Sequence, residues 1–459
     1  MRDLLLYILI GILFCEQIHG QSGASDPERQ ALVSVTPATK APATRAPARD
    51  LPVGSLEEFG VDSVALYQQV DSLMELGIRS EAFPGGQLHV AYRGKQVFHK
   101  TYGFHTYDSL YPTRATDLYD LASVTKIAAA LPALMRLTGE GKLDLDAPFS
   151  DYWHPWRRRR DKRDLTLREI LAHQAGLEPY IVFLSDVRSR KGLKRRFVRE
   201  HPSPRFGREA YAGRYVKDRF IRKMYRKINR SEVSKEKTYR YSGLTFLLFP
   251  EVVRELTGKP FDTYLRENIY DPLGLDHLAF LPARRLPGME AVPTELDTLF
   301  RNDLTRGWVH DENAALMGGI SGNAGLFGTA QDLAVLMQCY ANYGTYQGVR
   351  VLDSATVREF ARVQYPENDN RRGLGFDKPL PDNPDLSLEE AYPAPQASER
   401  SFGHSGFTGT FIWADPEYQL VFIFLSNRVY PSRDHRQLYE LGLRTRLQQA
   451  FYSALISAH

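Results

Sequence analysis

The stretch Asp120-Leu-Ala-Ser-Val-Thr-Lys-Ile-Ala-Ala-Ala130 places a serine, Ser123, three residues before a lysine, Lys126. The alanines and leucines over 128–134 are strong helix formers, which predicts that Ser123 lies in the first turn of a helix. Residues three apart share a helix face, so we expect the Lys126 amine to reach the Ser123 hydroxyl.

This spacing fits nucleophilic catalysis by a serine. A serine hydroxyl becomes a good nucleophile only when a neighbouring base takes its proton, and a neutral lysine amine can do so. The free N–H groups at a helix start also suit an oxyanion that develops beside the serine. By itself the pair is a weak signal, because the same spacing occurs by chance on many solvated helices.

Two further stretches contain candidate catalytic or binding residues. Tyr241-Ser-Gly243 precedes an apolar helix predicted over 244–256, and a tyrosine at a helix start can relay protons when cations lie near it. Gly403-His-Ser-Gly406 leads into a strand, and a glycine there leaves room for a ligand along the strand edge. A tyrosine packed at a domain edge and a solvated loop histidine are the structural alternatives.

The length and composition bound the class of protein. At 459 residues the chain exceeds what one hydrophobic core organises, which predicts two lobes. With 43% hydrophobic and 25% charged residues it reads as an ordinary globular protein, neither disordered nor membrane-embedded. No Cys/His cluster has metal-ligand spacing and no phosphate-binding glycine loop is present, so we expect no metal and no cofactor.

Residues 1–20 are predicted to be an export signal. Arg2 gives a charged start and an apolar run covers 4–14, which is shorter than the roughly 20 apolar residues of a spanning helix. Cys15 leaves open lipoprotein anchoring, but Phe14 stands where that processing needs a small residue. Plain export, to the periplasm or the medium, is preferred.

The remaining organisation follows from composition. Residues 21–55 are rich in Ala, Pro, Thr and Ser and read as a flexible linker. The catalytic domain is expected over 56–457, with a mainly helical lobe inserted at about 140–310. Cys339 lies in an apolar helical pattern and is expected to be a buried thiol.

The periodicity of the chain predicts an α+β fold. Strands are expected near both ends of the folded part, at 87–92, 96–102, 408–414 and 420–426. Helices are expected at 61–76, 165–177, 246–256, 261–269, 330–343 and 436–455. We therefore expect one sheet built from both ends of the chain, with helices between them.

The three stretches together resemble the serine β-lactamase and penicillin-binding-protein superfamily, in its class C β-lactamase and D-alanyl-D-alanine carboxypeptidase branch. That superfamily has S-x-x-K at a helix start, Y-x-N in the helical lobe, and K-T-G or H-x-G on a sheet-edge strand. The positions here read Ser123-Val-Thr-Lys126, Tyr241-Ser-Gly243 and His404-Ser-Gly406. The resemblance spans most of 80–430 and implies an antiparallel sheet flanked by helices.

The resemblance also implies roles. Ser123 would attack a carbonyl and form an acyl-enzyme, while Lys126 and Tyr241 move protons. The backbone N–H of Ser123, with one from the strand after Gly406, would form the oxyanion hole. The remaining candidates for substrate binding are His404, Ser405, Gly406 and Gly243.

Two departures from the pattern bear on the substrate. Gly243 stands where the family has an asparagine that contacts the substrate amide, and His404 replaces the commoner lysine at the carboxylate site. A histidine there is titratable and often neutral. A peptidase or esterase is therefore favoured over a true β-lactamase.

A basic segment at 157–235 has two interpretations. A solvated lid, kept open by its own charge, is preferred; attraction to anionic envelope polymers is the alternative. Nucleic acid is not expected as a partner of an exported protein. His310 and Asp311 are expected to form a buried polar pair without a catalytic role, and Asn323 to approach the site.

The sequence thus predicts an exported serine hydrolase, acting by an acyl-enzyme on a peptide, amide or ester. The substrate is expected to be a small molecule or peptide, related to peptidoglycan. The rival hypothesis is a catalytically degenerate penicillin-binding module that senses or holds wall peptides. No stable membrane span is expected, and no oligomeric state is predicted.

Overall fold

A computed structural model of the chain describes residues 50–456. The predicted export signal and nearly all of the predicted linker lie outside these residues, as does the C-terminal end of the predicted domain. Those boundaries therefore stay predictions.

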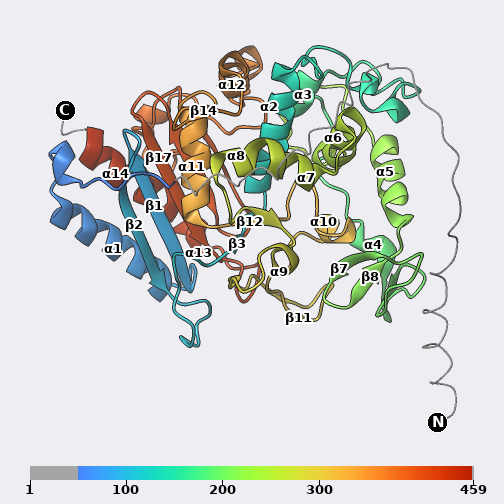
Figure 1. Cartoon of the computed structure of the whole chain (residues 1–459), viewed down its shortest axis with the longest axis horizontal. Helices are drawn as coiled ribbons and strands as arrows, with labels where there is room; N and C mark the ends of the chain where they lie inside the picture. Colours follow the sequence, from blue (N-terminus) through green and yellow to red (C-terminus); the bar gives the residue numbers. More distant parts are fainter. Residues whose placement is uncertain (1–49, 457–459) are drawn as a thin grey trace, which may run out of the picture. The chain divides into compact units, whose positions relative to one another are not determined.

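A five-stranded antiparallel sheet forms one part of the fold (Figure 1). Its strands, in spatial order, are β15 (Phe402–Ser405), β16 (Phe411–Asp415), β17 (Leu420–Ser426), β1 (Gly85–Tyr92) and β2 (Lys95–Gly103). The pairing of β17 with β1 joins residues more than 300 positions apart. The sheet drawn from both ends of the chain is confirmed.

The alternation of side chains along the strands explains why both faces of the sheet are covered. In β17 the side chains of Leu420, Phe422 and Phe424 join one hydrophobic cluster, while those of Val421 and Ile423 join another. Successive side chains of a strand point to opposite faces, so a run that is apolar throughout needs cover on both faces.

Three helices supply this cover. The helices α1 (Ser63–Arg79) and α14 (Leu443–Ile456) lie together on one face, and α11 (Ala330–Ala341) packs on the other (Figure 1). On the first face, the hydrophobic cluster that includes Phe422 fills the space between the sheet and α1 and α14. The cluster on the second face continues into the core of the region between the sheet segments.

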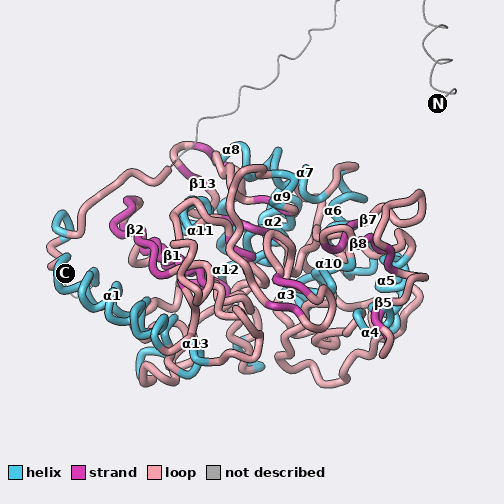
Figure 2. The backbone as a smooth tube through the Cα atoms, turned by 90° about the horizontal axis from the view of Figure 1, so that it is seen from below, coloured by secondary structure: helices cyan, strands magenta, loops and turns pink. Residues whose placement is uncertain are grey.

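The chain between the sheet segments contains short helices and short strands. Its helices are α2 (Leu131–Gly139), α3 (Leu167–Leu171), α4 (Leu184–Val187), α5 (Phe220–Arg230), α6 (Phe249–Thr257), α7 (Phe261–Leu265), α8 (Asp271–Leu273), α9 (Pro282–Arg285), α10 (Glu312–Leu316) and α12 (Ser354–Ala361). Its short strands are β3 (Tyr119–Asp120), β4 (Arg188–Ser189), β5 (Gly192–Leu193), β6 (Val198–Arg199), β7 (Arg208–Tyr211), β8 (Arg214–Val216), β9 (Ala279–Phe280), β10 (Leu296–Asp297), β11 (Asp303–Leu304), β12 (Leu326–Gly328), β13 (Thr345–Tyr346) and β14 (Val349–Arg350). Figure 2 shows how these short elements are joined by long loops.

Two predicted helices are shorter than expected. The helix predicted over 165–177 is only α3, capped by Thr166 and Glu169, and His173 beyond it has a left-handed φ of 56°. The last predicted helix is divided into α13 (Gln437–Glu440) and α14 by Gly442, whose φ is also 56°. A single left-handed residue interrupts the helical hydrogen-bond ladder.

The end of the predicted linker is ordered. Leu51 is buried, and the backbone groups of Pro52 and Gly54 bond to Gln96 at the start of β2. The folded part therefore begins before residue 56.

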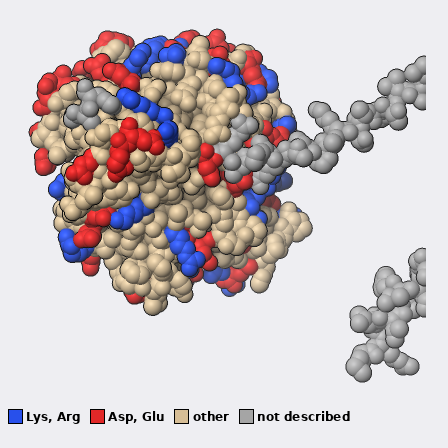
Figure 3. Space-filling model, turned by 60° about the vertical axis from the view of Figure 1, so that its left-hand side comes forward, with Lys and Arg blue, Asp and Glu red and all other residues tan. Residues whose placement is uncertain are grey.

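Charges of both signs are distributed over the protein. In the basic segment, Lys223 and Lys227 of α5 both pair with Asp186. On the face shown in Figure 3, lysines and arginines are interspersed with acidic side chains rather than gathered in one field. No helix within residues 50–456 has the length and apolarity needed to cross a membrane.

Candidate active site

Ser123 and Lys126 meet as the sequence predicts. Three successive i→i+3 backbone bonds, the last from Lys126 N–H to Ser123 C=O, wind this turn tightly, which stacks side chains three residues apart. Lys126 Nζ lies 2.8 Å from Ser123 Oγ and 3.2 Å from the Asn323 carbonyl oxygen. The lysine is buried, and its amine is in position to take the serine proton when it is neutral.

Strain and hydrogen bonds fix the turn that carries the serine. Ala122 has a φ of 44°, an unfavourable value for a residue with a side chain. The buried Asp120 holds it by accepting hydrogen bonds from Ala122 N–H, at 2.9 Å, and His310 N–H, at 2.6 Å. This arrangement directs the Ser123 side chain out of the turn.

Tyr241 completes the group. Its hydroxyl lies 3.4 Å from Ser123 Oγ, and Lys126 Nζ lies 5.4 Å from the centre of its ring. Burial raises the pKa of Tyr241, but the charge of Lys126, hydrogen bonds from Ser123 and Lys126, and the charge of Arg372 outweigh burial and lower that pKa below 10. A phenol whose pKa is lowered can exchange protons with the serine.

The sheet edge adjoins the serine turn. A side chain at Gly406 would come within 2.6 Å of the Leu121 carbonyl oxygen, so only glycine allows this approach. Thr410 Oγ1 donates to the same oxygen. Neither Ser123 N–H nor Phe407 N–H makes a hydrogen bond within the described residues, which leaves both donors available to a ligand.

His404 lies deeper than the sequence suggests. It is only 3% exposed, and its Nδ1 lies 2.7 Å from the Ser405 carbonyl oxygen. Since a carbonyl only accepts, Nδ1 carries the proton. Burial, followed by the charges of Arg372 and Lys126, lowers the pKa of His404 well below 6.5. A neutral imidazole, not a cation, therefore faces Tyr241, whose ring centre is 6.1 Å away.

Two charged or polar neighbours of Tyr241 were not predicted. His173 packs at 4.5 Å between ring centres and accepts a hydrogen bond from Ser242 N–H. The guanidinium of the buried Arg372 lies 5.7 Å from the Tyr241 ring and pairs with Asp377. An Arg-Arg-Gly run reads as a solvated loop, so no local signal marks Arg372.

Gly243 leaves a space at the site. Its N–H bonds to the Pro179 carbonyl oxygen, and a Cβ placed on it meets no atom within 4 Å. The side chain that the family pattern has at this position is therefore absent without a packed substitute.

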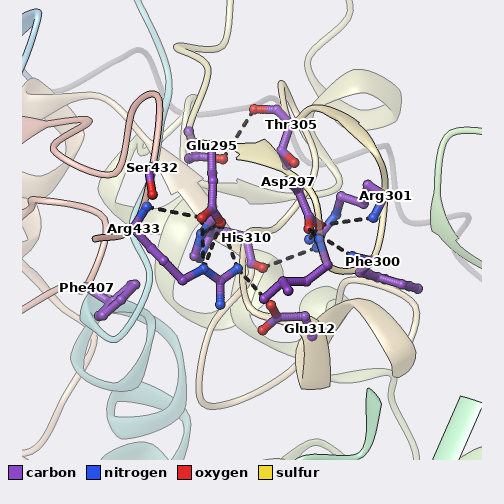
Figure 4. Close-up of polar contacts among 12 residues, drawn as sticks. Glu295, Asp297, Phe300, Arg301, Thr305, His310, Glu312, Phe407, Ser432 and Arg433 are labelled. Carbon is purple, nitrogen blue, oxygen red and sulfur yellow. Dashed lines mark hydrogen bonds and ion pairs between the residues drawn. The ribbon is translucent and has the colours of Figure 1, made fainter. Parts of the chain in front are cut away.

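A cavity of about 330 Å³ opens beside Ser123. Four large apolar side chains with unusually high exposure, between 42% and 58%, border it. They are Tyr180, Val182, Leu299 and Phe407. The polar part of its lining includes Glu312 and Arg433 (Figure 4). The cavity thus suits a substrate with an apolar part and a polar group.

His310 does not pair with Asp311 as expected. His310 Nε2 lies 2.7 Å from Glu295, which in turn binds Arg433 (Figure 4). Asp311 instead caps the N-terminus of α10 and accepts hydrogen bonds from Ala314 N–H and the Asn323 amide. Over residues 50–456, no group of three or more His, Cys, Asp or Glu side chains is arranged to hold a metal ion.

Known proteins resemble this chain in sequence and in fold. The family model described as Beta-lactamase matches residues 68–446. The N-acetylmuramyl-L-alanine amidase of Bacillus subtilis (strain 168) is 29% identical over 388 residues, which cover 79% of this chain and 80% of that protein. A protein of Escherichia coli O157:H7 named "Putative D-alanyl-D-alanine carboxypeptidase" is 31% identical over 386 residues, covering 79% and 80%.

A solved structure agrees in fold. The penicillin-binding protein homolog from Caulobacter crescentus superposes with a TM-score of 0.57 at 20% identity, covering 85% of this chain and 98% of that one. The chain belongs to the β-lactamase family, within the serine β-lactamase and penicillin-binding-protein superfamily of serine hydrolases.

Proposed function

We propose that the protein is an exported hydrolase that cleaves a peptide, amide or ester bond through an acyl-enzyme on Ser123. One observation carries the proposal: Ser123 Oγ lies within reach of both the Lys126 amine, at 2.8 Å, and the Tyr241 hydroxyl, at 3.4 Å. A nucleophile in contact with two proton-transfer groups is what acyl transfer requires.

The steps follow from these contacts. Ser123 Oγ attacks the substrate carbonyl carbon while its proton passes to Lys126 or Tyr241. The oxyanion is stabilised by the free N–H groups of Ser123 and Phe407. Collapse breaks the bond to the leaving group, which takes the proton. Water then attacks the ester carbonyl, gives a proton to the same groups, and releases the acid and Ser123.

The substrate is proposed to be related to the cell wall. The names of the Bacillus and Escherichia relatives favour an amide or peptide bond in a wall component, and export to the periplasm or the medium. The missing asparagine at Gly243 disfavours efficient β-lactam turnover. The alternative, a module that only binds wall peptides, is not favoured because the contacts of Ser123 are intact.

The test is a substrate panel of aryl esters, D-Ala-D-Ala peptides and β-lactams, with rapid acid quenching and intact mass measurement. We expect hydrolysis of at least one class and an acyl adduct in wild type. The variants Lys126→Ala and Tyr241→Phe should each lose most activity, and the double variant little more, because they act as one unit. No adduct and no turnover with any class would contradict the proposal.

A further inference from the structure

The polar wall of the cavity beside Ser123 carries an excess of negative charge. Among the described residues that line it, Arg433 is the one lysine or arginine, and two carboxylates bind it (Figure 4). Arg433 Nη2 lies 2.7 Å from Glu295 Oε2 and 2.8 Å from Glu312 Oε1, and Arg433 Nε lies 2.9 Å from Glu295 Oε1. Two carboxylates against one guanidinium leave one negative charge.

That charge resides on Glu312. Glu295 is 7% exposed and accepts from both Nε and Nη2 of the guanidinium, whereas Glu312 binds it through Oε1 alone. Glu312 Oε2 has no hydrogen bond within the described part of the chain, and Glu312 lines the cavity. A partly buried carboxylate oxygen without a donor favours a ligand that brings one, and most strongly a charged one.

The rest of the cavity wall also favours a ligand with a positively charged group. Its apolar border, including Tyr180 and Leu299, offers no hydrogen-bonding partner to a charged group except the Tyr180 hydroxyl, so a charged ligand would turn toward the polar side chains. Of the other cations near Ser123, Lys126 bonds to Ser123 and to the Asn323 carbonyl oxygen, and Arg372 pairs with Asp377. Within the described residues, neither forms an ion pair with Glu312.

We propose that this cavity selects substrates that carry a protonated amine, and that Glu312 is the residue that binds it. The inference rests on the proposed function and names the substrate class of the same site. Arg433 fixes the Glu312 carboxylate and does not itself offer the site a net positive charge.

The experiment uses aryl esters whose acyl chains are matched in length and end in an ammonium, a methyl or a carboxylate group. A second series places the same groups on the alcohol side. In wild type we expect kcat/KM for the ammonium ester of one series to exceed that of the methyl ester about tenfold, the usual size of a charge-assisted hydrogen bond. In Glu312→Gln that ratio should fall to about one.

A matched control is Glu75→Gln, because Glu75 lies exposed on α1, on the far side of the sheet. This variant should keep the wild-type ratio. Equal kcat/KM for the three esters in both series would overturn the proposal. A preference for the carboxylate ester that disappears in Arg433→Gln would also overturn the proposal. It would show that Arg433, and not Glu312, binds the charged group of the substrate.

Binding separates this inference from the proposed function. Amide analogues of the same compounds are titrated calorimetrically into Ser123→Ala, which cannot form an acyl-enzyme. Tighter binding of the ammonium analogue that depends on Glu312 supports the inference even if no ester is hydrolysed. Equal binding of all three analogues refutes it even if wild type proves to be an active hydrolase.

Discussion

Replacing Glu295 with glutamine should destabilise the protein in a strongly pH-dependent way. Burial raises the pKa of Glu295, but hydrogen bonds from His310 and Arg433 outweigh it and hold that pKa at about 2, compared with 4.5 for an ordinary glutamate. The carboxylate is 7% exposed, so solvent screens these interactions little. The folded state therefore stabilises the ionised carboxylate of Glu295 relative to the protonated acid.

The magnitude follows from linkage. A pKa lowered from 4.5 to about 2 corresponds to roughly 3 kcal/mol of stability at neutral pH. Because the folded-state pKa is the lower one, this contribution is complete above about pH 5 and is lost as the pH falls toward 2. By pH 3 about 2 kcal/mol of it should be gone.

The assay is equilibrium urea unfolding of wild type and Glu295→Gln at pH 7, 5, 4 and 3. Trp156 and Trp413 are fully buried, so their fluorescence reports unfolding. The difference in free energy of unfolding should be roughly 3 kcal/mol at pH 7 and should shrink to about 1 kcal/mol at pH 3. Glu75→Gln, which removes an exposed ion pair with Arg79, should stay within about 0.5 kcal/mol of wild type throughout.

Two results would contradict a stabilising role for the Glu295 charge. A Glu295→Gln difference that is the same at pH 7 and pH 3 would show that the carboxylate's charge is not what stabilises the fold. A difference below about 0.5 kcal/mol at pH 7 would show that desolvation cancels the contacts with His310 and Arg433.

Three more predictions concern the site and the chain's start. Gly243→Asn should fold with an unchanged melting temperature, because its Cβ has open space, and should react faster with penicillin in a gel labelling assay; a slower reaction would count against a binding role for this position. A chain starting at Asp50 should melt like the full-length protein, whereas one starting at residue 56 loses the buried Leu51 and should lose about 2 kcal/mol; equal melting of the two would argue against that packing. Because the pKa of His404 lies well below 6.5, KM for an acidic ester should vary no more than KM for a neutral one between pH 6 and 8, and a rise confined to the acidic ester would reveal a titrating imidazole.

The sequence is sufficient for elements whose pattern is local. The apolar run of 420–426 and the Arg93-Gly94 turn predict the β17 and β1–β2 strands, and both turn residues have the positive φ that such hairpins need, 49° and 77°. The Ser123–Lys126 contact is also local, because it spans one turn.

Contacts between distant segments could not be predicted in this way. Arg433 and Glu295 are separated by 138 positions, and their pairing depends on how two loops meet at the cavity. Likewise Ala172, beyond the end of α3, gives its carbonyl oxygen to the Asn370 side chain. Such a long-range bond competes with the helical bond that the local sequence favours.

The depth of His404 illustrates the same limit. Its position on the sheet edge follows from the motif, but its charge depends on burial beneath Tyr241 and on the nearby cation of Arg372. Arg372 arrives from a loop that pairs with β15 through Asp377 and Gly403. A motif gives the type of residue, whereas the protonation state depends on its neighbours in three dimensions.

The most direct test of the account is peptide-level mass spectrometry after reaction with a fluorophosphonate. We predict one phosphonyl adduct, on Ser123, in wild type, none in Ser123→Ala, and a rate of labelling in Lys126→Ala that is lower by at least about 100-fold. An adduct on another residue, or labelling of Ser123→Ala at the wild-type rate, would contradict the assignment of Ser123 as the nucleophile.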